Sequence, residues 1–284
     1  MTVQDPRAVE TPAPEEDVEM GFLDHLGELR TRLIRALWGL VPGVALAWVF
    51  KERLLDLLLE PFLDAWRKLG LGEPSIHFAN PIDPFVAYLK LALVAGALSA
   101  APWIFWQLWG FISPGLYKRE KRLAVPFALV STVCFVGGAF FGYAVVFPLG
   151  FETFLSYSGL LPSESVRIQP TIMIGEYLSF ATRMLLAFGV VFEIPVIITF
   201  MAAAGIVDWR QLLRFSKWWI LVATLIAAML TPPDVGSQLL MLGPLILLYF
   251  VSVGLAWIFG FRRKKAETAA DEEAAAKGED PYER

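Results

Sequence analysis

The stretch LAVPFALVSTVCFVGGAFFGYAVVFP, from Leu123 to Pro148, decides the fold class because it contains no charged residue. A helix needs about 20 apolar residues to cross the hydrocarbon core of a bilayer, so this stretch is long enough to span a membrane. Similar apolar blocks recur along the chain, which is 56% hydrophobic and 18% charged, with a mean hydropathy of +0.57. The sequence therefore predicts an all-α polytopic membrane protein rather than a soluble domain.

Six membrane spans follow from the positions of these blocks. A tight turn is expected at Thr231-Pro232-Pro233-Asp234, which favours two separate last helices over one broken re-entrant pair, and six spans over five or four. Residues 1–20 and 262–284 are rich in acidic residues and are expected to form disordered tails around a membrane domain at residues 21–261. The predicted spans are about 33–50, 85–111, 123–148, 177–204, 215–231 and 238–260.

Basic residues gather on alternate loops, which predicts how the chain is oriented. Under the positive-inside rule these loops face the cytoplasm, so both termini are expected there. Residues 22–33 show helical amphipathic spacing and predict a cytoplasmic surface helix, whereas residues 53–69 predict an interfacial helix on the far surface. The basic clusters comprise Arg30, Arg32 and Arg35, then residues 118–122, 210–217 and 262–265.

The chemistry-bearing residues are too few and too scattered for an enzyme. The one cysteine, Cys134, lies in an apolar block, and the two histidines, His25 and His77, fall on opposite sides of the membrane. No hydrolase, metalloprotease or phosphate-loop motif is present, so no catalytic residue, metal, cofactor or nucleic-acid partner is expected. A secondary transporter would require a paired inverted repeat, which the sequence lacks. The Gly39–Gly43 and Gly138–Gly142 small-xxx-small pairs predict close helix packing within the chain.

Glu193 stands out because it lies deep in the fourth predicted span. A carboxylate at this depth costs about 2.5–3.5 kcal/mol on insertion scales, which makes it a functional candidate. Arg183 lies ten residues earlier, roughly 15 Å along the same helix, and cannot pair with it. A structural role, with Glu193 hydrogen-bonded to a neighbouring helix, is the alternative that these residues leave open. Lys90, near one end of the second span, is expected to snorkel to the surface.

The family resemblance rests on six strings: FLDHLGELRTRL (22–33), ANPIDPFVAYLKLAL (79–93), SAAPWIFWQLWGFISPGLYKREKR (99–122), YAVVFPLGFETF (143–154), EYLSFATRMLLAFGVVFEIPV (176–196) and LTPPDVGSQ (230–238). These strings resemble the TatC family, the multi-span receptor subunit of the twin-arginine protein translocase. The resemblance implies a concave, glove-like bundle of six helices with both ends in the cytoplasm, placed in the bacterial inner membrane. It further implies a receptor that binds twin-arginine signal peptides and exports folded proteins with the proton-motive force. Expected partners are those signal peptides, TatA-type and TatB-type single-span subunits, further copies of the chain and lipid.

The resemblance also implies roles for individual residues. Glu28 and Glu120 match the two family glutamates that recognise the signal arginines, a sensible choice because carboxylates bind guanidinium groups through two parallel hydrogen bonds. Lysine cannot reproduce that fork. Glu193 matches the family glutamate presented inside the concave face, whereas Arg183 departs from the family pattern. The signal-peptide site is expected to include also Arg30, Phe111, Lys118 and Arg122, and roles in shape or partner contact are expected for Pro61, Pro102, Pro148, Asp234 and Gln238.

Overall fold

The structure, a computed structural model, describes residues 22–112, 124–160, 167–168, 170–230 and 235–276. Six helical stretches in this part are long and apolar enough to cross a membrane. The prediction of a six-span α-helical fold is confirmed, and two sheets of two-residue strands are added to it. The six stretches are His25–Val49, Asp83–Ile112, Val125–Ser156, Ile174–Ala203, Trp209–Met229 and Met241–Ile258.

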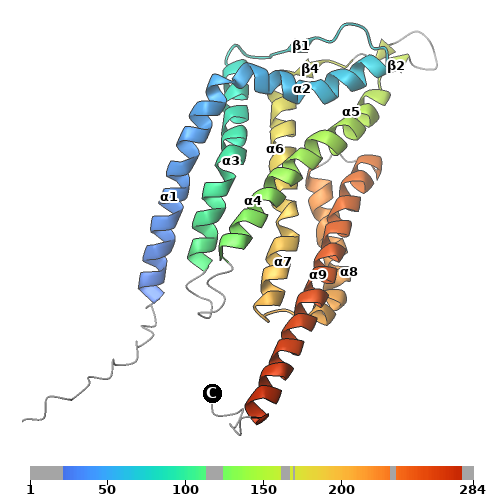
Figure 1. Cartoon of the computed structure of the whole chain (residues 1–284). Coiled ribbons are helices and arrows are strands. Elements are labelled where there is room, and N and C mark those ends of the chain that lie inside the picture. Colours follow the sequence, from blue (N-terminus) through green and yellow to red (C-terminus); the bar gives the residue numbers. More distant parts are fainter. Residues whose placement is uncertain (1–21, 113–123, 161–166, 169, 231–234, 277–284) are drawn as a thin grey trace, which may run out of the picture.

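The two ends of the helix bundle differ in what they carry. Helix α2 (Lys51–Lys68) lies across one end, which we call the cap end (Figure 1). The start of α1 (Phe22–Val49) and the end of α9 (Val235–Ala276) both lie at the opposite end, which we call the termini end (Figure 1). Helix α1 is continuous from Phe22, so the expected surface helix at 22–33 is the first part of the first span rather than a separate element.

The third and fourth spans are each interrupted at a proline. The third consists of α4 (Ala124–Phe141), a π-helical turn η3 (Gly142–Val146) and α5 (Phe147–Ser156), and it therefore extends past Pro148. The fourth consists of α6 (Ile174–Phe192) and α7 (Ile194–Ala203), with Glu193 at the junction. A proline has no backbone N–H, so Pro148 and Pro195 each remove one helical hydrogen bond and force these local adjustments.

The last two spans are formed by α8 (Trp209–Leu230) and α9, which pack against each other, and α9 also packs against α7. Helix α8 begins six residues before the predicted start at residue 215. Helix α9 continues through the basic run 262–265 to Ala276, where a disordered tail was expected. Alanine, glutamate and lysine dominate this segment, and all three are strong helix formers.

Helix α2 is fastened to the bundle by aromatic side chains, and two short sheets lie in the connecting segments. Tyr177 of α6 donates a hydrogen bond from its Oη to the carbonyl oxygen of Leu58, 2.6 Å away. The rings of Phe62, Phe151 and Tyr177 lie in mutual contact, with centroids 5.6 Å apart. The sheets pair β1 (Ile76–His77) in parallel with β4 (Ile172–Met173), and β2 (Gly159–Leu160) antiparallel to β3 (Arg167–Ile168).

Glycines allow two pairs of helices to pack closely. Helix α1 packs along α3 (Asp83–Ile112), where a Cβ at Gly43 would lie 2.7 Å from the carbonyl oxygen of Gly96. Helix α4 packs against α6, where a Cβ at Gly138 would run into the backbone oxygen of Phe188. Both predicted small-xxx-small pairs therefore lie at helix interfaces within the chain.

Candidate functional site

Glu28 lies near the termini end of α1 and binds the guanidinium group of Arg32, one helical turn further on. Its Oε1 accepts hydrogen bonds from Nε at 2.8 Å and from Nη2 at 2.7 Å. Its Oε2 is shielded from solvent and has no hydrogen-bond partner within the described part of the chain. Both guanidinium nitrogens therefore share Oε1, and the bidentate pairing in which each carboxylate oxygen accepts one N–H is not formed, because Oε2 is unused.

Aromatic and backbone contacts with α3 fix the surroundings of this pair. The ring of His25 stacks on Phe111, with centroids 4.5 Å apart and planes 18° apart. A Cβ at Gly110 would run into the guanidinium of Arg32, so a larger residue there would displace the Arg32 side chain. Phe111, predicted from the resemblance, is therefore brought within one turn of α1 from Glu28, while His25 and Gly110 were not predicted as members of this site.

Glu193 forms the second cluster, inside the bundle between α4 and the junction of α6 and α7. Its side chain is mostly buried and hydrogen-bonds with the hydroxyl of Ser131 on α4. That hydroxyl oxygen accepts a hydrogen bond from Nε1 of Trp109 on α3, 2.9 Å away. Because the Ser131 oxygen accepts from Trp109, its own proton is available to Glu193, so one chain of hydrogen bonds joins three spans.

Two polar atoms in the same region remain unsatisfied. Oε1 of Glu193 and Oγ1 of Thr199 on α7 are buried without a hydrogen-bond partner among the described residues. Unpartnered buried polar groups are costly, and in native structures they often mark a functional position. Glu193 makes no ion pair with any residue that the structure describes, in agreement with the expectation that Arg183 cannot reach it.

The other predicted residues are scattered over the molecule. Glu120, Lys118, Arg122 and Asp234 lie outside the described residues. Arg30 is exposed on α1, and Gln238 donates from Nε2 to the carbonyl oxygen of Thr224 on α8, 3.5 Å away. Pro61 and Pro148 line one recess of about 290 Å³ at the cap end, whereas Pro102 is exposed inside α3. The structure therefore groups only the two prolines of this set.

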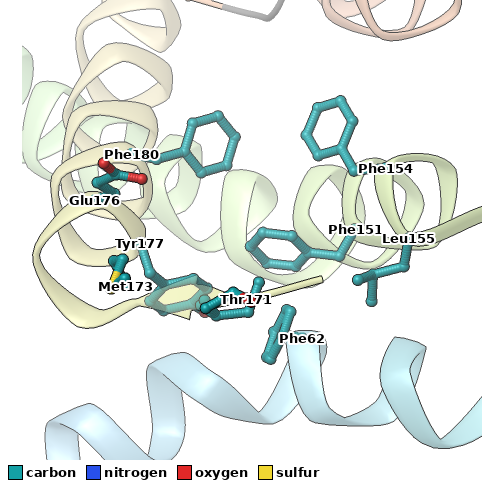
Figure 2. Close-up of a pocket in the computed structure, with 10 residues that line it drawn as sticks. Phe62, Phe151, Phe154, Leu155, Thr171, Met173, Glu176, Tyr177 and Phe180 are labelled. Carbon is teal, nitrogen blue, oxygen red and sulfur yellow. The ribbon is translucent and has the colours of Figure 1, made fainter. Parts of the chain in front are cut away.

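Sequence reasoning missed an aromatic pocket at the cap end (Figure 2). It has a volume of about 270 Å³, and Figure 2 shows Phe62 of α2 facing Phe151 of α5 and Tyr177 of α6. Among the described residues of its lining, Glu176 is the single charged one. The segments that form the pocket are separated in the sequence, and their aromatic content was the only signal in the sequence that could have indicated it. The same rings connect α2 to the bundle, which gives the pocket a structural role.

A comparison with family models matches residues 24–244 to the family described as Sec-independent protein translocase protein (TatC). The chain belongs to the TatC family. This TatC chain is 42% identical over 265 residues to the Sec-independent protein translocase protein TatC of Desulforapulum autotrophicum, with 93% of each chain covered. It is 34% identical over 250 residues to the protein of the same name from Aquifex aeolicus, with 88% of this chain and all of that one covered.

Solved structures agree with this assignment. The twin-arginine translocase receptor TatC, crystallised in the detergent DDM, matches with a TM-score of 0.71 and 34% sequence identity. The match covers 82% of this chain and 99% of that one. The protein is therefore a multi-pass membrane component of the twin-arginine translocation system, and a translocase component of this family rather than an enzyme.

Proposed function

We propose that this TatC protein is the receptor for twin-arginine signal peptides and the core of a translocase for folded proteins, driven by the proton-motive force. The observation that carries the proposal is the Glu28–Arg32 contact, a carboxylate already engaged with a guanidinium and holding one oxygen in reserve. A solved relative is named the twin-arginine translocase receptor, in agreement with this role. Glu120 is proposed as the second carboxylate, since the signal carries two arginines.

The proposed contact would be an exchange of one guanidinium for another. Arg32 holds Glu28 from the same helix, and both side chains are about a quarter exposed. An ion pair of this kind on a helix surface contributes only about 0.3–0.5 kcal/mol, so a signal arginine can displace Arg32 at little cost. Phe111 and its stacked partner His25 would support the signal peptide beside the carboxylate, and Arg30, Lys118 and Arg122 would bind its backbone or polar groups.

The termini end is proposed to face the cytoplasm in the bacterial inner membrane. The start of α1 and the end of α9 lie there (Figure 1). The exposed basic residues Arg30, Arg35 and Arg210 belong to helices that begin at this end, in the pattern of the positive-inside rule. TatA-type and TatB-type subunits, and further copies of the chain, are proposed as partners within the membrane. Glu193, with one unsatisfied buried oxygen, would accept a polar group from such a helix after local opening.

Binding of a signal peptide to the purified protein tests the receptor assignment. Glu28→Gln keeps the shape of the side chain but removes its charge. Because hydrogen bonds to charged groups contribute about 1.5–3 kcal/mol, the Kd for an Arg-Arg signal peptide should rise about 10–100-fold. Glu52→Gln, in the exposed first turn of α2 at the cap end, is the matched control and should leave the Kd unchanged.

Crosslinking locates the same contact independently. A photo-reactive signal peptide should crosslink within residues 28–32 and 111–122, and a Lys-Lys signal should not, because lysine lacks the guanidinium fork. Equal binding of the Lys-Lys signal, or binding that survives Glu28→Ala combined with Glu120→Ala, would refute the receptor assignment.

A further inference from the structure

Two cations on the membrane-facing surface meet at one serine near the cap end. Nζ of Lys90 on α3 donates to the hydroxyl of Ser179 on α6, 2.6 Å away. Nε of Arg183 donates to the backbone oxygen of the same serine, 2.8 Å away. Both cationic side chains are exposed, so Ser179 holds two positive charges side by side on the outside of the bundle.

The depth of this cation pair places it within the membrane, close to one interface. Arg183 lies nine residues after the first residue of α6, about 14 Å along the helix, and Lys90 lies seven after the first residue of α3, about 10 Å. The same two helices carry exposed apolar side chains: Leu89 and Leu93 on α3, and Val190 on α6, which is 62% exposed. Such a surface faces lipid rather than water, where unpaired charges are unfavourable.

The direction of the two side chains points toward the lipid headgroups. Helical side chains tilt toward the N-terminus of their helix, and both α3 and α6 begin at the cap end (Figure 1). The Arg183 hydrogen bond to Ser179, one turn nearer the cap end, follows this tilt. Long basic side chains reach toward the interface in this way, so the charged ends of the pair extend in the direction of the headgroup phosphates.

Within the described part of the chain, no carboxylate pairs with either cation. The ion pairs recorded there involve Arg32, Arg67 and Lys68. Glu176 occupies the same face of α6 as Arg183, two turns nearer the cap end, and forms no ion pair with it. With Nε engaged, the two terminal nitrogens of Arg183 still offer donors outward, and the Lys90 ammonium has two protons beyond the one that it gives to Ser179.

We propose that Lys90 and Arg183 form a binding site for the phosphate of an anionic phospholipid in the leaflet next to the cap end. The guanidinium supplies two parallel donors to the phosphate oxygens, the ammonium supplies a point charge, and Ser179 sets the spacing between them. The acyl chains lie against Leu89, Leu93 and Val190. A zwitterionic lipid fits less well, because its own ammonium group would add a third cation to the site.

Native mass spectrometry of the full chain in detergent tests the site. The probes are phosphatidylglycerol and phosphatidylcholine with identical acyl chains. Wild-type protein should retain phosphatidylglycerol preferentially, and Lys90→Gln combined with Arg183→Gln should lower the bound fraction about tenfold, which is about 1.4 kcal/mol. The control, Lys51→Gln with Arg53→Gln, removes the same charge from α2 at the cap end, where both cations lie over aromatic rings. It should retain the lipid.

A second variant distinguishes loss of the lipid site from loss of lipid binding through misfolding. Arg183→Lys keeps both charges but removes the guanidinium fork, so preference for phosphatidylglycerol should persist with a smaller bound fraction. The proposal is overturned if the double glutamine variant binds phosphatidylglycerol as the wild type does. Equal retention of phosphatidylcholine by wild-type protein overturns it too, as does release of the lipid by millimolar inorganic phosphate, which would indicate a water-exposed anion site.

Discussion

Two glycine-bearing helix interfaces hold the two candidate carboxylates, and they leave very different surroundings around each. The α1–α3 interface places Glu28 at the termini end, where its side chain is 21% exposed and binds a cation of its own helix. The α4–α6 interface surrounds Glu193, which is 8% exposed and hydrogen-bonds with the neutral Ser131. One carboxylate is therefore engaged by a replaceable charge, and the other is part of a network that joins helices.

This difference separates reversible binding from structural linkage. Replacing Arg32 by an incoming guanidinium leaves Glu28 with the same kind of partner throughout, so the exchange has a small free-energy cost. Breaking the Glu193 contacts leaves buried polar atoms without partners, which is costly unless another helix supplies a donor. Under the proposed function, Glu28 would bind a peptide that associates and dissociates, whereas Glu193 would bind a partner that stays in the membrane.

The largest effect should come from disturbing the α4–α6 interface at Gly138. In Gly138→Ala the new methyl group would meet the backbone oxygen of Phe188 and lie 2.8 Å from the Cβ of Phe192. Overpacking of this kind costs about 1–3 kcal/mol, so the thermal unfolding midpoint of the purified protein should fall. Gly137→Ala is the matched control, because nothing lies within 4 Å of its added Cβ. It should be neutral or stabilising by up to about 1 kcal/mol.

Equal midpoints for the two alanine variants would show that α4 and α6 can separate without cost. Glu193 would then not be held by close packing, and the contrast with Glu28 would lose its structural basis.

A smaller effect is expected from Ser131→Ala, which tests the hydrogen-bond network itself. The change removes the acceptor of the Trp109 N–H and the donor to Glu193. Each hydrogen bond between membrane helices contributes about 0.6 kcal/mol on average, so the loss of both should lower the free energy of unfolding by about 1 kcal/mol. Chemical unfolding of the purified protein in mixed micelles measures it.

Thr132→Val serves as the control, since Thr132 bonds only the carbonyl oxygen of Ala128 in its own helix, 2.8 Å away. If both variants unfold alike, Ser131 contributes no more than an ordinary intrahelical hydroxyl, and Glu193 is not linked to α3 through it.

The spans could be predicted because the length of an apolar run is a local property of the sequence. To predict that the block from Leu123 to Pro148 spans a membrane, it is enough to compare its length with the thickness of the hydrocarbon core. The helix continues to Ser156, past the predicted end at Pro148, because a π-helical turn accommodates that proline. Residues 262–276 belong to α9, where a disordered tail was predicted, and their alanine and glutamate content is compatible with both.

The contacts around the carboxylates could not be predicted in the same way. The sequence identified Glu193 as unusual, but Ser131 and Trp109 come from two other spans and are unremarkable residues in apolar blocks. The helix spacing of Glu28 and Arg32 is visible in the sequence, yet the fit of the guanidinium against Gly110 depends on how α1 packs on α3. The periodicity of the sequence predicts which side chains share one face of a helix, but it does not predict which other helix packs against that face.

The smallest expected effect concerns the competition at Glu28. Arg32→Gln removes the guanidinium that occupies Oε1, so an Arg-Arg signal peptide should bind about twofold more tightly, the ~0.3–0.5 kcal/mol of a helix-surface ion pair. Arg35→Gln is the control, because it removes the same charge one turn further along α1. The backbone oxygen of residue 35 still accepts the hydrogen bond from Nε1 of Trp103 in this variant. Titration calorimetry on both variants separates the release of Glu28 from the change in net charge. Weaker binding by Arg32→Gln than by Arg35→Gln would mean that Arg32 positions the carboxylate instead of competing for it. Glu28 would then be a preorganised part of a packed interface, as Glu193 is, and the distinction between the two carboxylates would rest on exposure alone.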